Sequence, residues 1–127
     1  MTLNQRVKGL AKGPNFAAFT TLTKSGAPMT HVMWVDCDEE HVLINTEAHR
    51  AKFKHVRRDP RVAVAIIDRD NPYSYAEVRG TVTDIVFGND ARRHIDELSR
   101  KYEGHDYANE ITSERVILKI KPDRQRP

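Results

Sequence analysis

The sequence predicts a mainly β (α+β) fold in one domain over residues 1–127, a small antiparallel β-barrel of six strands with flanking helices. Three observations favour this fold class. Most of the β-rich runs follow one another through short polar turns, as the strands of hairpins do. Only two or three segments have the apolar spacing of a helix, which is too few for a doubly wound parallel sheet. Neither a GxGxxG sequence nor a Walker-type loop is present, so the common nucleotide-binding α/β folds are not indicated.

The first part of the chain is predicted to contain a short helix followed by a hairpin. Leu3, Val7 and Leu10 recur at helical spacing, so residues 3–12 are expected to form an amphipathic helix that ends at Gly13. Three β-rich runs follow, separated by polar turns. The strands expected here span residues 15–23, 27–35 and 41–46, and the turns span residues 24–26 and 36–40.

The second part of the chain is predicted to contain three more strands and one long helix. Residues 61–67 form a nearly continuous apolar run, which predicts a strand buried on both faces. Residues 74–86 alternate in polarity, and Gly80 within them is expected at a bulge. The helix that follows should have its cap at Asn89 or Asp90, apolar positions at Ala91, Ile95, Leu98 and Tyr102, and its end at Gly104. A last strand is expected at residues 116–120, followed by a basic tail.

Composition favours a reducing compartment. Cys37 is the only cysteine, so an internal disulfide or a multi-cysteine metal site is excluded. The first residues are polar and basic, without the apolar core of a secretion signal, and no run is long enough to span a bilayer. We therefore expect a cytoplasmic protein with no membrane partner. Hydrophobic residues make up 39% of the chain and charged residues 31%, so either the core is thin or a second copy covers apolar surface.

A dense basic segment, His49–Arg61, follows the strand predicted at residues 41–46. Its six full positive charges are Arg50, Lys52, Lys54, Arg57, Arg58 and Arg61. A strand that leads into a cationic helix start is suited to hold a phosphate or another anion. On a helical projection, Lys52 lies beside the inward-facing Val56, whereas most of the other cations face outward. Either Lys52 extends along apolar neighbours to reach water, or it clamps a phosphate together with Arg50.

Other candidate side chains give weaker signals. None of the six histidines has the spacing of metal ligands, so no metal site is expected. His31 lies mid-strand, where it either faces a ligand cleft or is an ordinary strand residue, and it is the single speculative catalytic candidate. Cys37 lies in a turn among acidic residues, which raise the pKa of its thiol and disfavour a nucleophilic role. Tyr73 and Tyr75 share one face, as either a packing pair at a strand edge or an aromatic wall for a planar ligand.

A nucleic-acid partner is not expected, although a nucleic-acid-binding small barrel stays an alternative. The formal net charge of +3 and the pI of about 9.1 fit an anionic ligand, a nucleic acid, or neither. The two tyrosines near a basic cluster resemble a stacking platform. However, the other aromatic residues are scattered and no RNA-binding motif occurs.

The order of these features resembles the pyridoxamine 5′-phosphate oxidase-like split β-barrel proteins. Within that family the chain looks most like the branch that binds coenzyme F420, the flavin/deazaflavin oxidoreductases of actinobacteria. The resemblance covers most of the chain, and it is more specific for the superfamily than for the cofactor. The matching segments are Gly26-Ala27-Pro28, Thr46, Arg50-Ala51-Lys52, residues 57–62, Tyr73-Ser74-Tyr75, Val78-Arg79-Gly80 and Glu114-Arg115-Val116.

This resemblance implies a six-stranded antiparallel split β-barrel of the FMN-binding type, which forms a homodimer with two cofactor clefts at its interface. The cofactor carries the hydride, so no catalytic side chain is expected. Residues implied in cofactor binding are Thr30, His31, Val32, Met33, Trp34, Thr46, Arg50, Ala51 and Lys52, with Tyr73 and Tyr75 reaching in from the second subunit. Glu47 departs from a simple phosphate clamp, because its charge would oppose a phosphate unless it points away or the pocket differs.

The predicted function is an F420-dependent oxidoreductase that transfers hydride to a small, unsaturated organic substrate. An FMN-dependent oxidoreductase of the same fold and a non-catalytic F420-binding or carrier protein are the alternatives. F420 carries an acidic oligoglutamate tail, for which the exposed cations Arg6, Lys8, Lys12, Arg57 and Arg58 are candidates. The C-terminal end is shorter than in the vitamin B6 oxidases, so pyridoxamine phosphate oxidation is not expected.

Overall fold

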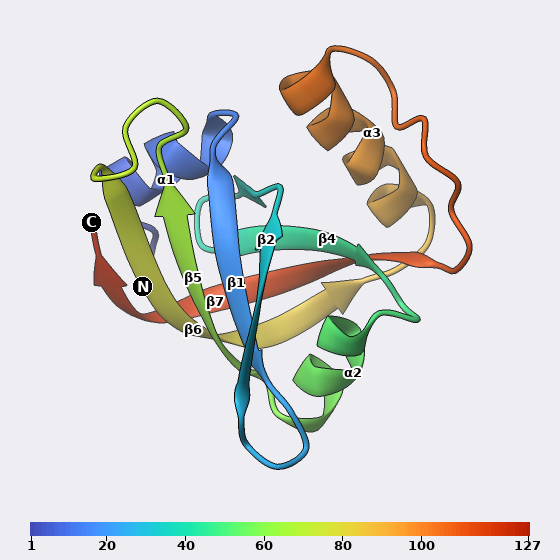
Figure 1. Cartoon of the computed structure of the whole chain (residues 1–127), viewed down its shortest axis with the longest axis horizontal. Coiled ribbons are helices and arrows are strands. Elements are labelled where there is room, and N and C mark those ends of the chain that lie inside the picture. The colour runs from blue at the N-terminus through green and yellow to red at the C-terminus, as the bar shows by residue number, and fades with distance from the viewer.

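Two twelve-residue strands cross the molecule and connect its two halves (Figure 1). They are β6 (Tyr75–Val86) and β7 (Arg115–Arg126), which pair with each other along most of their length. The first half of β6 also pairs with β5 (Arg61–Ile67), and the first half of β7 also pairs with β4 (Val42–Glu47). In this computed structural model, which describes residues 1–127, all strands form one antiparallel sheet in the order β2-β1-β5-β6-β7-β4-β3.

The remaining elements are three helices and three strands. They are α1 (Gln5–Lys12), β1 (Phe16–Leu22), β2 (Pro28–Met33), β3 (Asp36–Cys37), α2 (Ala51–Arg58) and α3 (Asn89–Glu103). In the β1–β2 turn, the backbone N–H of Gly26 donates to the Thr23 carbonyl (2.8 Å), and Gly26 has a φ of 88°. This left-handed conformation costs glycine little, so the turn predicted at residues 24–26 closes a tight hairpin.

Register shifts bend the sheet at β6. They lie between Arg79 and Gly80 and between Val82 and Asp84, opposite β7. A Cβ atom at Gly80 would lie 2.4 Å from the carbonyl oxygen of Lys121, so only glycine fits at the first shift. Such irregularities bend a strand and increase its twist. The bulge predicted at Gly80 is therefore confirmed, and it helps the sheet to curl into a half-barrel.

The curled sheet encloses the hydrophobic core, and the helices cover its openings. Alternate strand residues face inward, including Phe19, Ile44, Val64 and Leu118, each at most 1% exposed. Full burial of such a side chain stabilises the fold by about 1.5–3 kcal/mol. Figure 1 shows α1 at one end of the barrel, α2 near the other end, and α3 outside the sheet, where it packs over β4 and β7.

The structure confirms the predicted mainly β split barrel with flanking helices, but the sheet has seven strands rather than six. The additional strand, β3, lies inside the turn predicted at residues 36–40, because Asp36 and Cys37 pair with β4. The last strand continues to Arg126, since its second half pairs with β6. The basic tail predicted after residue 120 is therefore part of β7.

The start of α3 also differs from the prediction. Gly88 is the N-cap residue, with a φ of 76°, and its N–H donates to Glu114 Oε2 (3.1 Å). The prediction that Asn89 or Asp90 caps this helix is wrong, because the chain leaves β6 through a left-handed residue, and that conformation favours glycine. Gly104 ends the helix as predicted, with a φ of 83°.

β5 is buried on one face only. Val62, Val64 and Ile66 point into the core, whereas Ala63 and Ala65 on the outer face are half-buried. The prediction of a strand buried on both faces is therefore wrong for a single chain. No helix covers the outer surface of β1, β5 and β6 in Figure 1, and we call this surface the bare face.

Candidate functional site

The basic segment forms a loop and then α2. Arg50 stands at the N-cap position without a side-chain cap, and its N–H donates to the Glu47 carbonyl (3.0 Å). The helix ends before the Asp-Pro step, since proline has no N–H and disfavours the helical conformation in the residue before it. Lys52 and Val56 are its buried residues. One cation therefore turns inward at the start of the helix, as the helical projection predicts.

Lys52, the inward cation, lacks a partner. It is 7% exposed, and no carboxylate or carbonyl of the protein pairs with its ammonium group. Burial lowers the pKa of Lys52, and the positive charges of Arg50 and Arg115 lower it further. The Lys52 ammonium is still in contact with solvent. Ser99 Oγ is the sole fully buried side-chain N or O atom without a hydrogen-bond partner, so Lys52 Nζ, which also has no partner, cannot be fully buried. A nearly buried ammonium that reaches open space among other cations is prepared to receive an anion.

Arg115, the first residue of β7, brings a second buried charge to the same region. It is 9% exposed, and its Nε donates to Asn45 Oδ1 (2.9 Å). Its guanidinium carbon lies 5.3 Å from the centre of the Tyr107 ring. Burial lowers the pKa of Arg115, although Tyr107 and Glu47 act in the opposite direction. No carboxylate lies at ion-pair distance from this guanidinium.

Glu47, the carboxylate that the sequence places beside the clamp, is engaged by the loop before β7. It accepts hydrogen bonds from the Thr112 N–H (2.9 Å) and the Thr112 hydroxyl (3.4 Å). His49 Nδ1 lies 3.4 Å from Glu47 Oε2. The Glu47 oxygens are therefore contacted by Thr112 and His49 rather than by Arg50, Lys52 or Arg115. Arg50, Lys52 and Arg115 are left without an ion pair, and we call them the cation trio.

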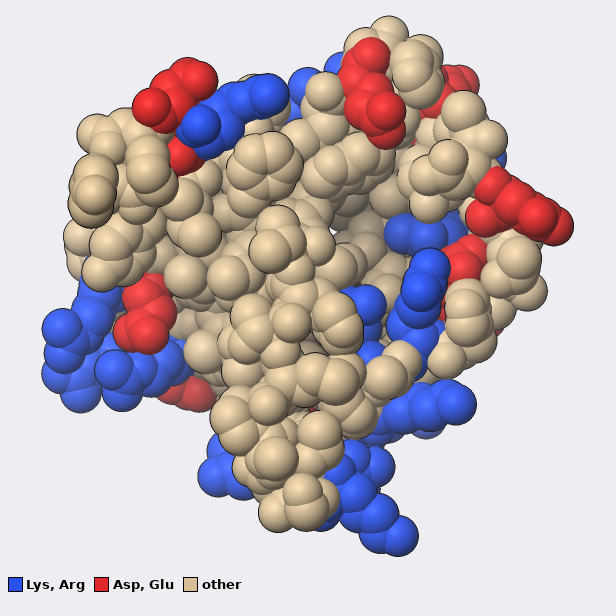
Figure 2. Space-filling view, in the orientation of Figure 1, with Lys and Arg blue, Asp and Glu red and all other residues tan.

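An apolar pocket of about 240 Å³ reaches the cation trio through Arg115. It lies between β2 and α3. Figure 2 shows a hollow there, with Lys and Arg side chains gathered on the side towards α2. Its lining residues are Val32, Met33, Trp34, Asn45, Ile95, Leu98, Tyr107, Asn109 and Arg115. A concave, mostly apolar site with a few polar groups suits a planar organic ligand.

The wall that Trp34 contributes to this pocket is held in place by α3. Its indole stacks on Tyr102 at 5.0 Å with an interplanar angle of 5°, and its edge meets Tyr107 at 6.3 Å. The next residue is also fixed, because the Val35 N–H donates to the Tyr102 hydroxyl (3.0 Å) and Lys101 Nζ donates to the Val35 carbonyl (2.5 Å). The pocket is therefore largely formed before any ligand enters.

The five residues predicted at Thr30–Trp34, in the second half of β2 and directly after it, separate into two groups. Residues 32–34 line the pocket. Thr30 is exposed, and its hydroxyl hydrogen-bonds the Thr20 hydroxyl (2.7 Å). His31 is half-buried, close enough to His55 for their charges to interact, and it does not line the pocket.

The other predicted residues lie in three places. Thr46 is 3% exposed in β4, and Ala51 is the exposed first residue of α2. Tyr73 and Tyr75 are 92% and 54% exposed, in and after the β5–β6 turn. Figure 1 shows this turn near α1, at the opposite end of the barrel from α2. Within one chain, the tyrosines cannot join the cation trio.

Six pocket residues are not predicted as site residues from the sequence: Asn45, Ile95, Leu98, Tyr107, Asn109 and Arg115. Ile95 and Leu98 are expected only as the apolar face of a helix. The sequence does carry a signal for Asn45 and for Arg115. Asn45 is a polar residue within an apolar strand, and Arg115 immediately precedes another apolar strand. Strand alternation places both on the outer face of the sheet, but only the folded chain brings that face under α3.

Metal and thiol chemistry find no support among the side chains. No group of three or more His, Cys, Asp or Glu residues lies close enough together to hold a metal ion. Cys37 is buried in β3, and burial raises the pKa of its thiol, with Asp36 and Asp38 adding to the effect. The thiol is therefore a weak nucleophile, as predicted.

The helices also give no sign of a membrane span. None of them is both long and apolar enough to cross a bilayer.

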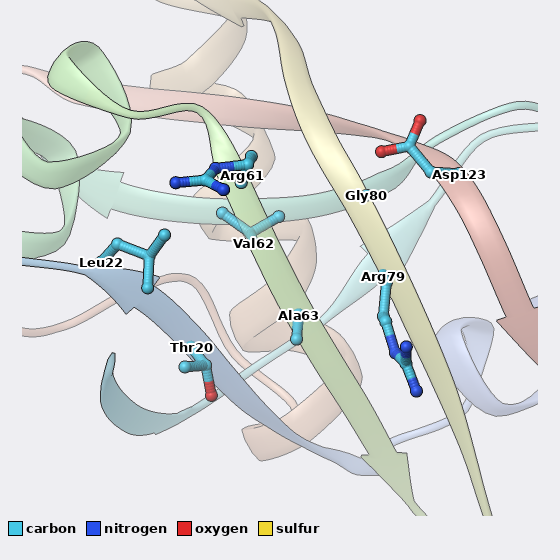
Figure 3. A pocket seen from close by; sticks show the side chains of 8 residues that line it. All are labelled: Thr20, Leu22, Arg61, Val62, Ala63, Arg79, Gly80 and Asp123. Atoms are coloured by element: carbon cyan, nitrogen blue, oxygen red, sulfur yellow. The ribbon is translucent and has the colours of Figure 1, made fainter. Parts of the chain in front are cut away.

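A second hollow, of about 320 Å³, lies on the bare face (Figure 3). Leu22, Val62 and Ala63 contribute apolar surface, and Arg61 and Arg79 lie at its charged edge. It shares no lining residue with the pocket beside the cation trio. An open apolar strand face with charged edges has the character of an interaction surface rather than of a cofactor slot.

Known structures share this fold. An F420 reductase is 29% identical, with a TM-score of 0.82, covering 97% of this chain and 98% of that chain. A conserved hypothetical protein of Mycobacterium tuberculosis is 21% identical, with a TM-score of 0.76 and coverage of 97% and 82%. General Stress Protein 26 of Bacillus anthracis is 18% identical, with a TM-score of 0.66 and coverage of 95% and 89%. The last two likenesses support the fold alone. No curated protein matches the chain.

A family-level match spans nearly the whole chain. The sequence profile of pyridoxamine 5′-phosphate oxidase matches residues 3–126, from the residues before α1 to the end of β7. The match therefore includes the basic segment, α2 and the pocket under α3. This chain belongs to the pyridoxamine 5′-phosphate oxidase family, whose members are generally flavin-binding oxidoreductases.

Proposed function

We propose that this protein is an oxidoreductase that binds coenzyme F420 and transfers hydride between this deazaflavin and a small, unsaturated organic substrate. The observation that carries the proposal is the cation trio, with two of its members buried and none in an ion pair, beside an apolar pocket. Flavin and deazaflavin cofactors combine a planar ring system with a phosphate. These are the two groups that the pocket and the trio fit.

Arg50 and Lys52 would hold the phosphate at the start of α2. The first N–H groups of a helix have no intrahelical partner, and the helix dipole is positive at this end. Lys52 is buried without a counter-anion, so a bound phosphate would offset the cost of burying its charge. In the alternative reading, Lys52 only reaches water, and no anion then offsets the repulsion that Arg50 and Arg115 exert on its charge.

Residues 32–34 would form one wall for the ring system, with Asn45 and Arg115 as the directed polar groups. When bound, the cofactor supplies the hydride-transfer chemistry. The protein would bind and orient it, and the aromatic contacts of Trp34 would keep water from that side. We assign no catalytic side chain. His31 lies outside the pocket and stays a prediction without a defined role, as do the cofactor contacts of Thr30, Thr46 and Ala51.

The F420 reductase that is 29% identical favours F420 over FMN. FMN is the second candidate, because it also carries a phosphate and because the chain belongs to a generally flavin-binding family. A carrier that binds F420 without turnover is the third. All three functions would use the same cation trio to hold either F420 or FMN, so binding and turnover must be measured separately.

The acidic tail of F420 would extend towards the free cations of α2. Arg57 and Arg58 are exposed in the last turn of α2, the helix whose first turn carries Lys52. The cations of α1 are less suited, because Lys8 and Lys12 each pair with a carboxylate (2.7 and 3.0 Å) and Arg6 donates to a backbone carbonyl (2.9 Å). They also lie at the other end of the barrel (Figure 1).

A homodimer would complete the site. The bare face is uncovered in a single chain, and Tyr73 and Tyr75 are exposed beside it. A second copy on this face would bury apolar strand surface and carry the tyrosines towards the other subunit's pocket. We expect a solution mass of twice 14.6 kDa. Ala65→Arg, on the bare face, should give the single-chain mass, and a wild-type protein that is already monomeric would contradict the proposed dimer.

Parallel fluorescence titrations with F420 and FMN test the proposed function. Tight and selective binding of F420, followed by oxidation of reduced F420 with an unsaturated acceptor, is the expected result. Selective FMN binding would move the enzyme to the flavin branch while keeping the phosphate clamp. Binding of F420 without turnover by any acceptor would favour the carrier, and binding of neither cofactor would contradict the proposal.

A further inference from the structure

A chain of buried polar side chains beneath α3 leads to Arg115. His94 Nε2 lies 2.9 Å from Asp36 Oδ2, and His94 Nδ1 lies 3.0 Å from Asn45 Nδ2. Asn45 Oδ1 then accepts the hydrogen bond from Arg115 Nε (2.9 Å). His94 and Asn45 are 6% and 4% exposed. This series of hydrogen-bonded side chains therefore connects β3, α3, β4 and β7 away from bulk water.

The two outer partners of Asn45 determine how its amide is oriented. The Ala91 carbonyl can only accept a hydrogen bond, and Arg115 Nε can only donate one. Nδ2 must therefore face Ala91 (3.0 Å), and Oδ1 must face Arg115. The second hydrogen of Nδ2 points to His94. This orientation follows from the partners and does not depend on how the amide atoms are assigned.

The orientation of Asn45 in turn determines the protonation of His94. Because Nδ2 donates, His94 Nδ1 must accept, and the ring must be neutral on that side. Nε2 then carries the hydrogen and donates it to Asp36, which Lys12 also contacts (3.0 Å). In this hydrogen-bonded series, each donor therefore faces an acceptor. A proton on Nδ1 would set two donors against each other and release the amide.

We propose that His94 is a positioning residue that, acting through Asn45, holds the Arg115 guanidinium towards the anionic ligand of the pocket. The nature of that ligand rests on the proposed function. Arg115 is fixed by one Nε hydrogen bond and by the side chain of Tyr107, and no carboxylate forms an ion pair with its guanidinium. An arginine held in this way loses less conformational freedom when it binds an anion. His94 itself does not line the pocket.

The test compares His94→Leu with His94→Asn. Leucine removes the acceptor, whereas asparagine can still accept from Asn45 with its side-chain oxygen. The first readout needs no ligand: NMR exchange protection of the Arg115 Nε–H. We expect His94→Leu to abolish this protection and to weaken cofactor binding about tenfold. His94→Asn should retain both, with binding within about threefold of the wild type. Ser99→Ala, at another buried α3 position, should change neither readout.

Three outcomes would overturn the proposal. The first is a folded His94→Leu variant in which the Arg115 Nε–H stays protected. The second is an equal loss of protection in His94→Asn, because a merely structural role would not be rescued by the conservative change. The third is a wild-type nitrogen spectrum near neutral pH in which His94 carries its proton on Nδ1. This last measurement decides the matter even if His94→Leu does not fold.

The proposed function can fail separately. If neither F420 nor FMN binds, the exchange protection and the His94 tautomer still test the positioning role. If a cofactor binds but His94→Leu leaves Arg115 protected, the function stands and the positioning role falls.

Discussion

The two ends of α2 carry similar positive charge in opposite environments. At its start, Lys52 is 7% exposed and has no partner. Near its end, Arg57 and Arg58 are exposed, and beyond it Arg61 pairs with Asp59 at 2.7 Å. Water solvates the exposed cations at little cost, whereas a buried and unpaired cation destabilises the fold. The comparison indicates that burial, rather than charge density, distinguishes a binding site from a solvated face.

The largest expected effect separates Lys52 from its exposed neighbour Lys54. Lys52→Met should raise the dissociation constant of the bound cofactor more than tenfold, because it removes a charge-assisted hydrogen bond worth about 1.5–3 kcal/mol. The same change should raise the free energy of unfolding of the ligand-free protein by about 1 kcal/mol, since it removes an unpaired buried charge. Calorimetric titration and urea unfolding measure the two quantities. Lys54→Met should alter neither the dissociation constant nor the free energy of unfolding. Equal effects at Lys52 and Lys54 would show that burial does not distinguish the two lysines.

Asp36 and Asp59 show the same contrast between an interior and a surface charge, although the pKa of each carboxylate is about 2 in the folded protein. Burial alone would raise the pKa of Asp36, but hydrogen bonds from His94, the Cys37 backbone and Lys12 lower it. Hydrogen bonds from Arg61 lower the pKa of Asp59, which lies at the protein surface, where solvent screens its charge. We expect Asp36→Asn to destabilise the fold at neutral pH by about 1–3 kcal/mol, and Asp59→Asn to change it little.

The pH dependence follows from the sign of the Asp36 shift. Its folded pKa of about 2 lies below the ordinary value of 3.8, so the folded state binds the proton less well than the unfolded state. The carboxylate therefore stabilises the fold above about pH 4, and this contribution is lost as the pH falls towards about 2. Thermal unfolding between neutral pH and this range should show a smaller acid-induced decline for Asp36→Asn than for the wild type. An identical decline would show that Asp36 does not carry this stabilisation.

A smaller effect is expected at the exposed end of α2. The double variant Arg57→Gln, Arg58→Gln should weaken binding of F420 with its acidic tail about threefold at low salt, and the difference should vanish at high salt. FMN, which lacks the tail, should bind equally well to both proteins. A loss of affinity for FMN as large as that of Lys52→Met would mean that the exposed end belongs to the phosphate site.

The smallest effect concerns the pH dependence of binding. Because the pKa of Lys52 is lowered by burial and by Arg50 and Arg115, its charge is lost at a lower pH than in an ordinary lysine. Affinity for an anionic cofactor should therefore decline as the pH rises into that range. Lys52→Arg keeps the charge and should flatten the decline. Parallel profiles for the two proteins would assign the pH dependence to another group.

The fold class and the inward position of Lys52 could be predicted because both depend on local periodicity. Polar turns punctuate the strands, and one helical turn relates Lys52 to Val56. The two-residue strand β3 gives no such pattern, since its pairing depends on where β4 happens to lie. The basic tail after residue 120 likewise gives no apolar alternation, although its backbone pairs with β6.

The pocket could be predicted only in part because it combines segments that are far apart in the chain. The family resemblance predicts residues 32–34 as cofactor contacts. Arg115, in contrast, is brought close to Lys52 only by the pairing of β7 with β4. Asn45 reads as an irregularity in a strand until α3 covers it and His94 completes its hydrogen bonds. Burial and pairing of these polar groups are properties of the tertiary structure, which periodicity does not encode.

The most direct test is an NMR titration of the Lys52 side chain, following its Cε and Nζ signals with and without F420. In the free protein we predict a pKa for Lys52 below that of an ordinary lysine, because burial and the two neighbouring arginines oppose its charge. Addition of F420 should raise this pKa, since a phosphate beside the ammonium favours the charged form. A Lys52 that titrates like an ordinary lysine in the free protein, or whose pKa does not move when the cofactor binds, would contradict the role of Lys52 as the buried anion contact.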